Sequence, residues 1–109
     1  MSITDPGKID AIAQEKNTLI MLLSDHLIWS KEQPAHLSML QEKLNTYIRF
    51  ISSGEYLEHT GGKRYDDFLI RIAFRYPPHR AFDEMLLLAK KQLDERHIRI
   101  IYTTEENMI

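Results

Sequence analysis

The chain contains no cysteine among its 109 residues. This absence excludes disulfide bridges, thiolate catalysis, thiolate zinc sites and thiol redox switching, so stability must come from packing. A domain of this length buries roughly two-thirds of the surface that its unfolded chain exposes, which is enough for one hydrophobic core and too little for two. We therefore expect a single domain over residues 1–109 and exclude a multidomain enzyme.

Long apolar runs and an excess of one charge are missing as well. The longest uncharged apolar run covers residues 18–24, far below the roughly 18 residues that a membrane helix needs. The 14 Lys and Arg nearly balance the 16 Asp and Glu, which argues against a nucleic-acid-binding tail. Residues 1–7 lack the basic start and apolar stretch of a secretory signal. We expect a cytoplasmic protein with no nucleic-acid or membrane partner.

The first 30 residues favour a pair of antiparallel strands. Residues 8–14 alternate loosely in polarity, and residues 18–23 form a short apolar run. Residues 15–17 connect the two, and a turn-rich Asp-Pro-Gly at 5–7 precedes them. We expect the second strand to be more buried than the first.

A helix should follow these strands. Ser30 and Gln33 have the spacing of a capping box, and Pro34 suits the first turn of a helix. Gly54 can adopt the left-handed conformation that ends a helix. One apolar stripe is expected to face the core, and it consists of Leu37, Leu40, Leu44, Tyr47, Ile48 and Ile51.

The second half of the chain predicts a strand, a helix and a strand. Residues 55–64 show no periodicity and contain Gly61 and Gly62, which indicates a mobile loop. Residues 67–76 alternate strictly in polarity, as in a strand with one buried face, and two prolines then end it. The next helix should pack through Phe82, Met85, Leu86, Ala89 and Leu93. A closing strand is expected over residues 98–102.

The order strand, strand, helix, strand, helix, strand predicts the α+β class. The matching architecture is a two-layer sandwich, in which both helices pack on one face of a four-stranded antiparallel or mixed sheet. Residues 103–109 are expected to be a frayed tail. The other face of the sheet would remain uncovered.

Arginine side chains mark this uncovered face. If the alternation holds, Arg71, Arg75 and Arg99 project there, together with Leu69, Ala73 and Ile101. Guanidinium groups bind carboxylates and phosphates bidentately, so the arginines could hold an anion or an acidic partner. Alternatively, Asp10 and other acids pair with them across the strands. A mixed surface of Arg and aliphatic residues also suits a dimer interface.

Met39 and Phe50 lie off the main stripe of the first helix by more than ~100° on the helical wheel. His36 and Lys43 lie nearby. An exposed Phe beside a Met would be a contact with another subunit or partner. The alternative is that the second helix or the segment 55–64 covers both residues.

Several patterns that could suggest a site are better explained otherwise. The sequence Ser24-Asp25-His26 holds the residue types of a hydrolase triad, but consecutive strand residues point to opposite faces. The five histidines form no paired metal-ligand spacing, and we expect no metal and no other cofactor. Residues 61–63 precede a strand, whereas a phosphate loop precedes a helix. Trp29 is expected to anchor the connection before the first helix, with its N–H bonded to one partner.

The chain resembles a family of small, uncharacterised bacterial domains. The resemblance covers most of the chain, in these segments: Asp5-Pro6, Ile9-Asp10-Ala11-Ile12, Asp25-His26-Leu27, Trp29, His36-Leu37, Leu40-Gln41-Glu42-Lys43-Leu44-Asn45, Tyr47, Arg49-Phe50-Ile51, Ser53-Gly54-Glu55 and Tyr76-Pro77-Pro78. It implies a bacterial cytosolic protein and assigns no catalytic residue.

These observations favour a non-catalytic binding or interaction domain that self-associates, for example as a homodimer. One alternative is a small-molecule anion sensor or enzyme that uses Arg71, Arg75 and Arg99, with His26 as acid or base. Another is an immunity-type inhibitor of a bacterial toxin. A cavity of ~300 Å³ or more bordered by the arginines would favour the ligand, and a flat surface would favour a protein partner.

Overall fold

The computed structural model describes residues 7–29 and 33–105. Its elements are β1 (Ala11–Glu15), β2 (Thr18–Asp25), α1 (Gln33–Ser52), the 3-10 helix η1 (Glu55–His59), β3 (Asp67–Phe74), α2 (Arg80–Glu95) and β4 (Ile98–Thr104). The capping box expected at Ser30 to Gln33 lies mostly outside the described residues. The order of strands and helices is the expected one, and the α+β class is confirmed.

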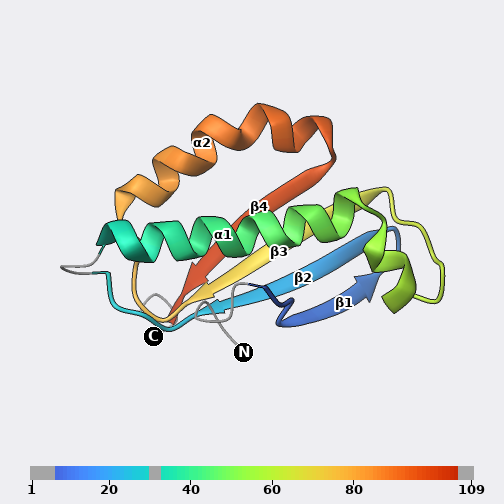
Figure 1. The fold of residues 1–109 in the computed structure, drawn as a ribbon, viewed down its shortest axis with the longest axis horizontal. Helices are drawn as coiled ribbons and strands as arrows, with labels where there is room; N and C mark the ends of the chain where they lie inside the picture. The colour runs from blue at the N-terminus through green and yellow to red at the C-terminus, as the bar shows by residue number, and fades with distance from the viewer. Residues whose placement is uncertain (1–6, 30–32, 106–109) are drawn as a thin grey trace.

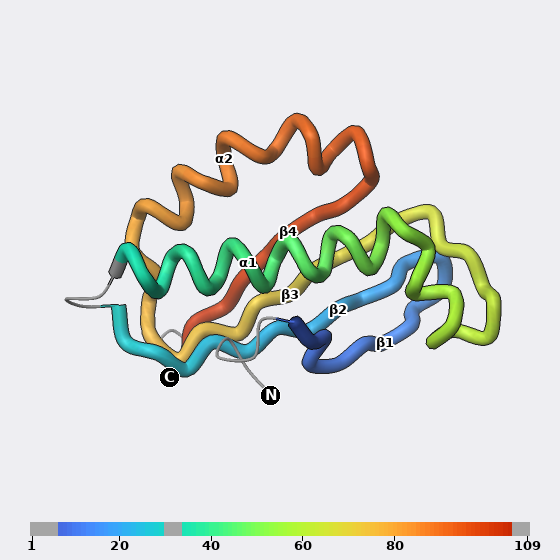
Figure 2. The backbone as a smooth tube through the Cα atoms, in the orientation of Figure 1, coloured from blue at the N-terminus to red at the C-terminus, as the bar shows by residue number. Residues whose placement is uncertain are grey.

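The four strands form one mixed sheet in the order β1-β2-β3-β4 (Figure 1). β1 pairs with β2 antiparallel, whereas β2, β3 and β4 are mutually parallel. Each parallel pair is joined by a crossover connection that contains a helix. Both connections, from β2 to β3 and from β3 to β4, move toward the same edge of the sheet. Because both have the same hand, their helices lie on the same face. Figure 2 shows α1 and α2 on the same side of the sheet. The expected two-layer arrangement is therefore confirmed.

β1 begins later and β3 ends earlier than expected, because hydrogen-bond partners determine where each strand starts or stops. β1 begins at Ala11 rather than residue 8, because the Asp10 N–H bonds to the Tyr47 hydroxyl instead of a strand. β3 ends at Phe74 rather than residue 76, because its partner on β2 is Asp25, the last residue of that strand. No further β2 residue extends the ladder.

β4 is longer than expected, and the frayed tail is correspondingly shorter. Thr103 and Thr104 pair with the end of β3, and the side chain of Thr104 is buried. The expectation of fraying from residue 103 is therefore wrong for these two residues. Residues 106–109 lie outside the described part of the chain.

The core lies between the helices and one face of the sheet. Leu40, Leu44 and Tyr47 of α1 and Phe82 and Leu93 of α2 pack on the strands there. The strand residues of this face are Leu19, Met21, Leu23, Phe68, Ile70, Ile72, Phe74 and Ile98. The expected face of α2 is confirmed, since its remaining members are partly buried against the same core.

The expected stripe of α1 is confirmed, because four of its six residues are in the core and Leu37 and Ile48 are half-buried against it. The buried face also includes the polar His36 and Lys43, which the stripe did not contain. α1 ends as expected, because Gly54 has a φ of 81°, in the left-handed region.

The segment expected to be a mobile loop, residues 55–64, contains η1. Tyr56 of this short helix is buried, and its ring meets Phe68 edge-on at 5.2 Å between centroids. The segment therefore has an anchor in the core. No helix in the described ranges is long and apolar enough to cross a membrane.

Candidate functional site

The sheet face opposite the helices is where the sequence placed its arginines. Arg71 and Arg99 are exposed on this face, because their strand neighbours Ile70, Ile72 and Ile98 are buried under the helices. The register sets Arg71 beside Ile101 and Arg99 beside Leu69, so the two arginines are diagonal neighbours. This open face also carries Ala11, Ala13, Ile20, Leu22, Leu69, Ala73 and Ile101.

Arg75 does not join the other two arginines in one site. It follows the end of β3, where its backbone N–H bonds to Asp25 O and its guanidinium lies 5.8 Å from the centre of the Tyr76 ring. A cavity of about 360 Å³ has Arg99 on its wall, but neither Arg71 nor Arg75 lines it. This cavity is therefore not one that the three arginines border together.

The acid expected to neutralise the arginines lies elsewhere. Asp10 pairs with Lys43 of α1, on the helix side of the sheet, with 2.7 Å between Oδ1 and Nζ. Among the described residues, no ion pair joins a carboxylate to Arg71 or Arg99. Pairing with Asp10 therefore does not explain the arginines.

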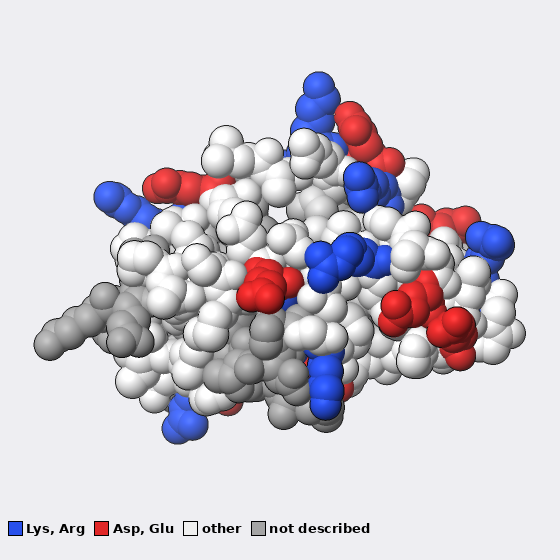
Figure 3. Space-filling view, in the orientation of Figure 1, with Lys and Arg blue, Asp and Glu red and all other residues white. Residues whose placement is uncertain are grey.

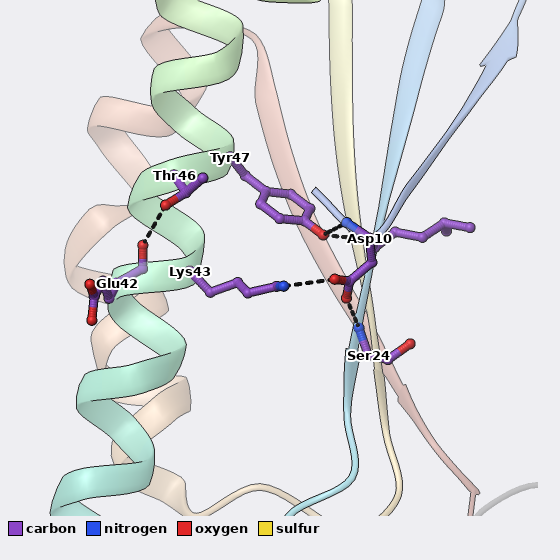
Figure 4. A network of polar contacts seen from close by, with 7 residues as sticks. Asp10, Ser24, Glu42, Lys43, Thr46 and Tyr47 are labelled. Carbon is purple, nitrogen blue, oxygen red and sulfur yellow. Dashed lines mark hydrogen bonds and ion pairs between the residues drawn. The ribbon is translucent and has the colours of Figure 1, made fainter. Parts of the chain in front are cut away.

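The Asp10–Lys43 pair belongs to a buried polar network, drawn in Figure 4. Asp10 Oδ2 accepts the Ser24 N–H at 2.9 Å, and the Lys43 side chain is fully buried. The Tyr47 hydroxyl accepts the Asp10 N–H at 3.0 Å and donates to Leu22 O at 2.5 Å. Burial raises the pKa of Tyr47 far above its ordinary value, so the phenol stays neutral. The network ties α1 to the first two strands.

A second buried pair links α1 to the end of β2. His36 Nε2 lies 2.6 Å from Asp25 Oδ2, and Asp25 Oδ1 accepts the Leu27 N–H at 3.1 Å. The Trp29 ring stacks on His36 at 3.7 Å and meets Phe74 at 6.1 Å, so it anchors this connection as expected. Contrary to the expectation, its indole Nε1 has no hydrogen-bond partner among residues 7–29 and 33–105. The partner of Asp25 is thus His36 and not the neighbouring His26.

Met39 and Phe50 do not form the exposed patch expected on α1. Phe50 is buried, and its ring lies 5.3 Å from that of His59 in η1. Met39 is half-buried against the core. The alternative prediction was that segment 55–64 covers these residues, and for Phe50 it is correct.

Among the described residues, the large exposed apolar side chains are Ile28, between β2 and α1, and three residues on α2 and β4. Leu87 and Leu88 of α2 are 73% and 86% exposed, and Ile101 of β4 is 41% exposed. Leu87 and Ile101 both line the groove of about 360 Å³ between α2 and β4. In the part of the chain that the structure describes, β4 is an edge strand, because β3 alone pairs with it. Leu87 was not predicted as a site residue, although the sequence places it outside the apolar stripe of α2.

A larger cavity of about 640 Å³ lies beside β1. It is lined by residues of the β1 region, the second half of α1 and η1, including Arg49, Phe50 and His59. This cavity was not predicted from the sequence, because its lining residues come together through the turn at Gly54. Within residues 7–29 and 33–105, no group of three or more His, Asp or Glu side chains could hold a metal ion.

Comparison with known proteins gives one match. Neither a curated protein nor a solved structure matches the chain. Residues 1–106 match the profile of a family described as a family of unknown function, DUF6572. The match spans nearly all of the chain, so the expected resemblance to a small uncharacterised family is confirmed. The chain belongs to the DUF6572 family of unknown function.

Proposed function

We propose that this protein is a non-catalytic interaction domain that forms a homodimer through the edge of β4 and the adjacent flank of α2. The observation that supports the proposal is an unpaired apolar edge strand beside exposed Leu87 and Ile101. A free strand edge pairs readily with another strand unless it is short, charged or covered. β4 has seven residues, and its only charged side chain is Arg99.

The backbone of β4 is suited to pairing with its own copy. Phe68 N–H bonds to His97 O, so His97 and alternate residues after it direct their backbone groups toward β3. Ile98, Ile100, Tyr102 and Thr104 then direct theirs to the free edge. An antiparallel pair centred on Ile101 uses the whole strand, because residue 98 meets 104 of the copy and residue 100 meets 102.

The same register avoids a clash of like charges. Arg99 lies opposite Thr103 of the copy, so the two copies of this arginine do not face each other across the strands. Ile101 lies opposite its own copy on the open face. The symmetry is a two-fold axis perpendicular to the sheet, which is the common symmetry of homodimers.

This axis also brings the two copies of α2 together. Phe82 on α2 contacts Phe74 of β3 and Tyr102 of β4, so α2 lies above these two strands. With strands about 4.8 Å apart, the two copies of α2 come to lie about 10 Å apart, which is a normal distance for packed helices.

The flank of α2 centred on Leu87 is complementary to itself. Six charged residues lie within ~60° of Leu87 on the helical wheel at ~100° per residue. In an antiparallel pair of helices centred on Leu87, they meet as Arg80 with Asp94, Asp83 with Lys91, and Glu84 with Lys90. Every pairing joins opposite charges. Figure 3 shows basic and acidic side chains together over both ends of α2, with uncharged atoms between them.

Light scattering on the purified chain tests the proposal. We expect a mass of about 26 kDa, twice the 12.9 kDa of one chain. Leu87→Asp should give a monomer, because two copies of the new carboxylate would meet at the axis. Leu88→Asp is the matched control, since Leu88 lies ~100° from Leu87 on the wheel and should leave the dimer intact. A monomeric native chain, or equal effects of the two variants, would contradict the proposal.

A further inference from the structure

The cavity of about 640 Å³ beside β1 has the size of a small-molecule site. One part of its wall is apolar and is formed by Ile9, Ile12 and Phe50. The rest is polar and includes Thr46, Arg49 and His59. Pockets that bind small organic molecules combine an apolar wall with a few polar groups in this way.

Local structure explains why the cavity has this shape. Gly54, with a φ of 81°, turns the chain after α1 so that η1 folds back beside the helix. The ring of His59 then lies 5.3 Å from that of Phe50, which places an imidazole next to the apolar wall. Within residues 7–29 and 33–105, β1 is an edge strand, so no described strand lies next to it on that side.

Arg49 is the main polar group available to a ligand. Among the described residues, its guanidinium makes one hydrogen bond, a long one of 3.4 Å to Thr46 Oγ1, and the residue is exposed. A guanidinium has five N–H donors, so most of them are free to bind an anion. Lys8 and Glu55 also line the cavity, one basic and one acidic.

We propose that this cavity binds a small organic anion that has an apolar body and a phosphate or carboxylate head. The head binds the Arg49 guanidinium bidentately, close to the Thr46 hydroxyl and the His59 imidazole. The apolar body lies against Ile12 and Phe50. This site is separate from the surface proposed for dimerisation, and the two proposals can fail independently.

Amide chemical-shift mapping with three probes tests the site. Hexyl phosphate should give saturable shifts at the residues that line the cavity. Inorganic phosphate lacks the apolar body and 1-hexanol lacks the anion, so each should bind at least about tenfold more weakly. If either simple probe binds as tightly as hexyl phosphate, the two-part site is wrong. If the shifts map to other residues, the cavity is not the site.

Two matched variants locate the anion. Arg49→Gln should weaken hexyl phosphate binding about tenfold or more, because the charge-assisted bonds to the head are lost. Arg71→Gln makes the same chemical change on the open face of the sheet and should leave the affinity unchanged. The spectra also show whether each variant is folded. Loss of binding with Arg71→Gln but not with Arg49→Gln would place the anion on the sheet and overturn the proposal.

Discussion

The buried Asp10–Lys43 pair allows a quantitative test of what holds α1 on the sheet. Lys43→Met keeps most of the side-chain volume and removes the charge. Asp10, whose side chain is 8% exposed, then keeps only the Ser24 N–H as a hydrogen-bond donor to its carboxylate. Removing one partner of a buried pair typically costs about 3–5 kcal/mol, which is a large part of the 5–15 kcal/mol by which small domains are stable.

A double-mutant cycle separates the pair from its surroundings. Asp10→Asn removes the carboxylate from the pair, and the double variant removes both charges. We expect the double variant to lose about 1–3 kcal/mol less than the sum of the single losses, because either single change already abolishes the direct attraction between the two side chains. Urea unfolding followed by circular dichroism gives the four free energies. Single losses below about 1 kcal/mol, or additive losses, would refute the argument.

Three further outcomes follow from the structure. Leu44→Ala should cost about 2–5 kcal/mol, since Leu44 is buried in the core, and an unchanged melting temperature would contradict this packing. The hydrogen bond to Asp83, followed by desolvation, raises the pKa of Tyr102 from 10.0 to about 12. The folded state holds this proton more tightly, so its contribution to stability is complete below pH 10 and is lost as the pH rises through about 12. Absorbance titration of Asp83→Asn should show that this pKa falls back toward 10. Gly54→Ala should destabilise by about 1 kcal/mol, measured by urea unfolding, because an alanine is strained at a φ of 81°.

Strict alternation along β3 made the sheet predictable. It placed Ile70 and Ile72 on the buried face and Arg71 on the open face, and both placements are correct. On α1 the apolar stripe identified the packed residues but missed the polar His36 and Lys43, which are buried beside them. His36 and Lys43 are buried because Asp25 and Asp10 pair with them. These partners lie 11 and 33 residues earlier in the chain. Such pairing depends on the tertiary fold and leaves no local pattern.

The candidate sites were harder to predict from the sequence, because they too depend on the tertiary fold. The helical wheel describes α1 alone, so it left open whether Phe50 is exposed or covered, whereas in the structure η1 returns and contacts it. The cavity beside β1 depends on the same return of the chain. The β4 edge could be recognised only once β4 was known to end the sheet.

A single engineered cysteine tests the proposed dimer most directly. The chain has no cysteine, so any disulfide formed by Ile101→Cys must join two copies through that position. Directly opposed residues in a non-hydrogen-bonded antiparallel pair have Cα atoms about 4.5 Å apart, within the range that a disulfide spans. Thr103→Cys is the control, because Thr103 lies opposite Arg99 of the copy. We predict rapid covalent dimerisation of the 101 variant under mild oxidation and little of the 103 variant; equal yields, or none at 101, would contradict pairing through β4.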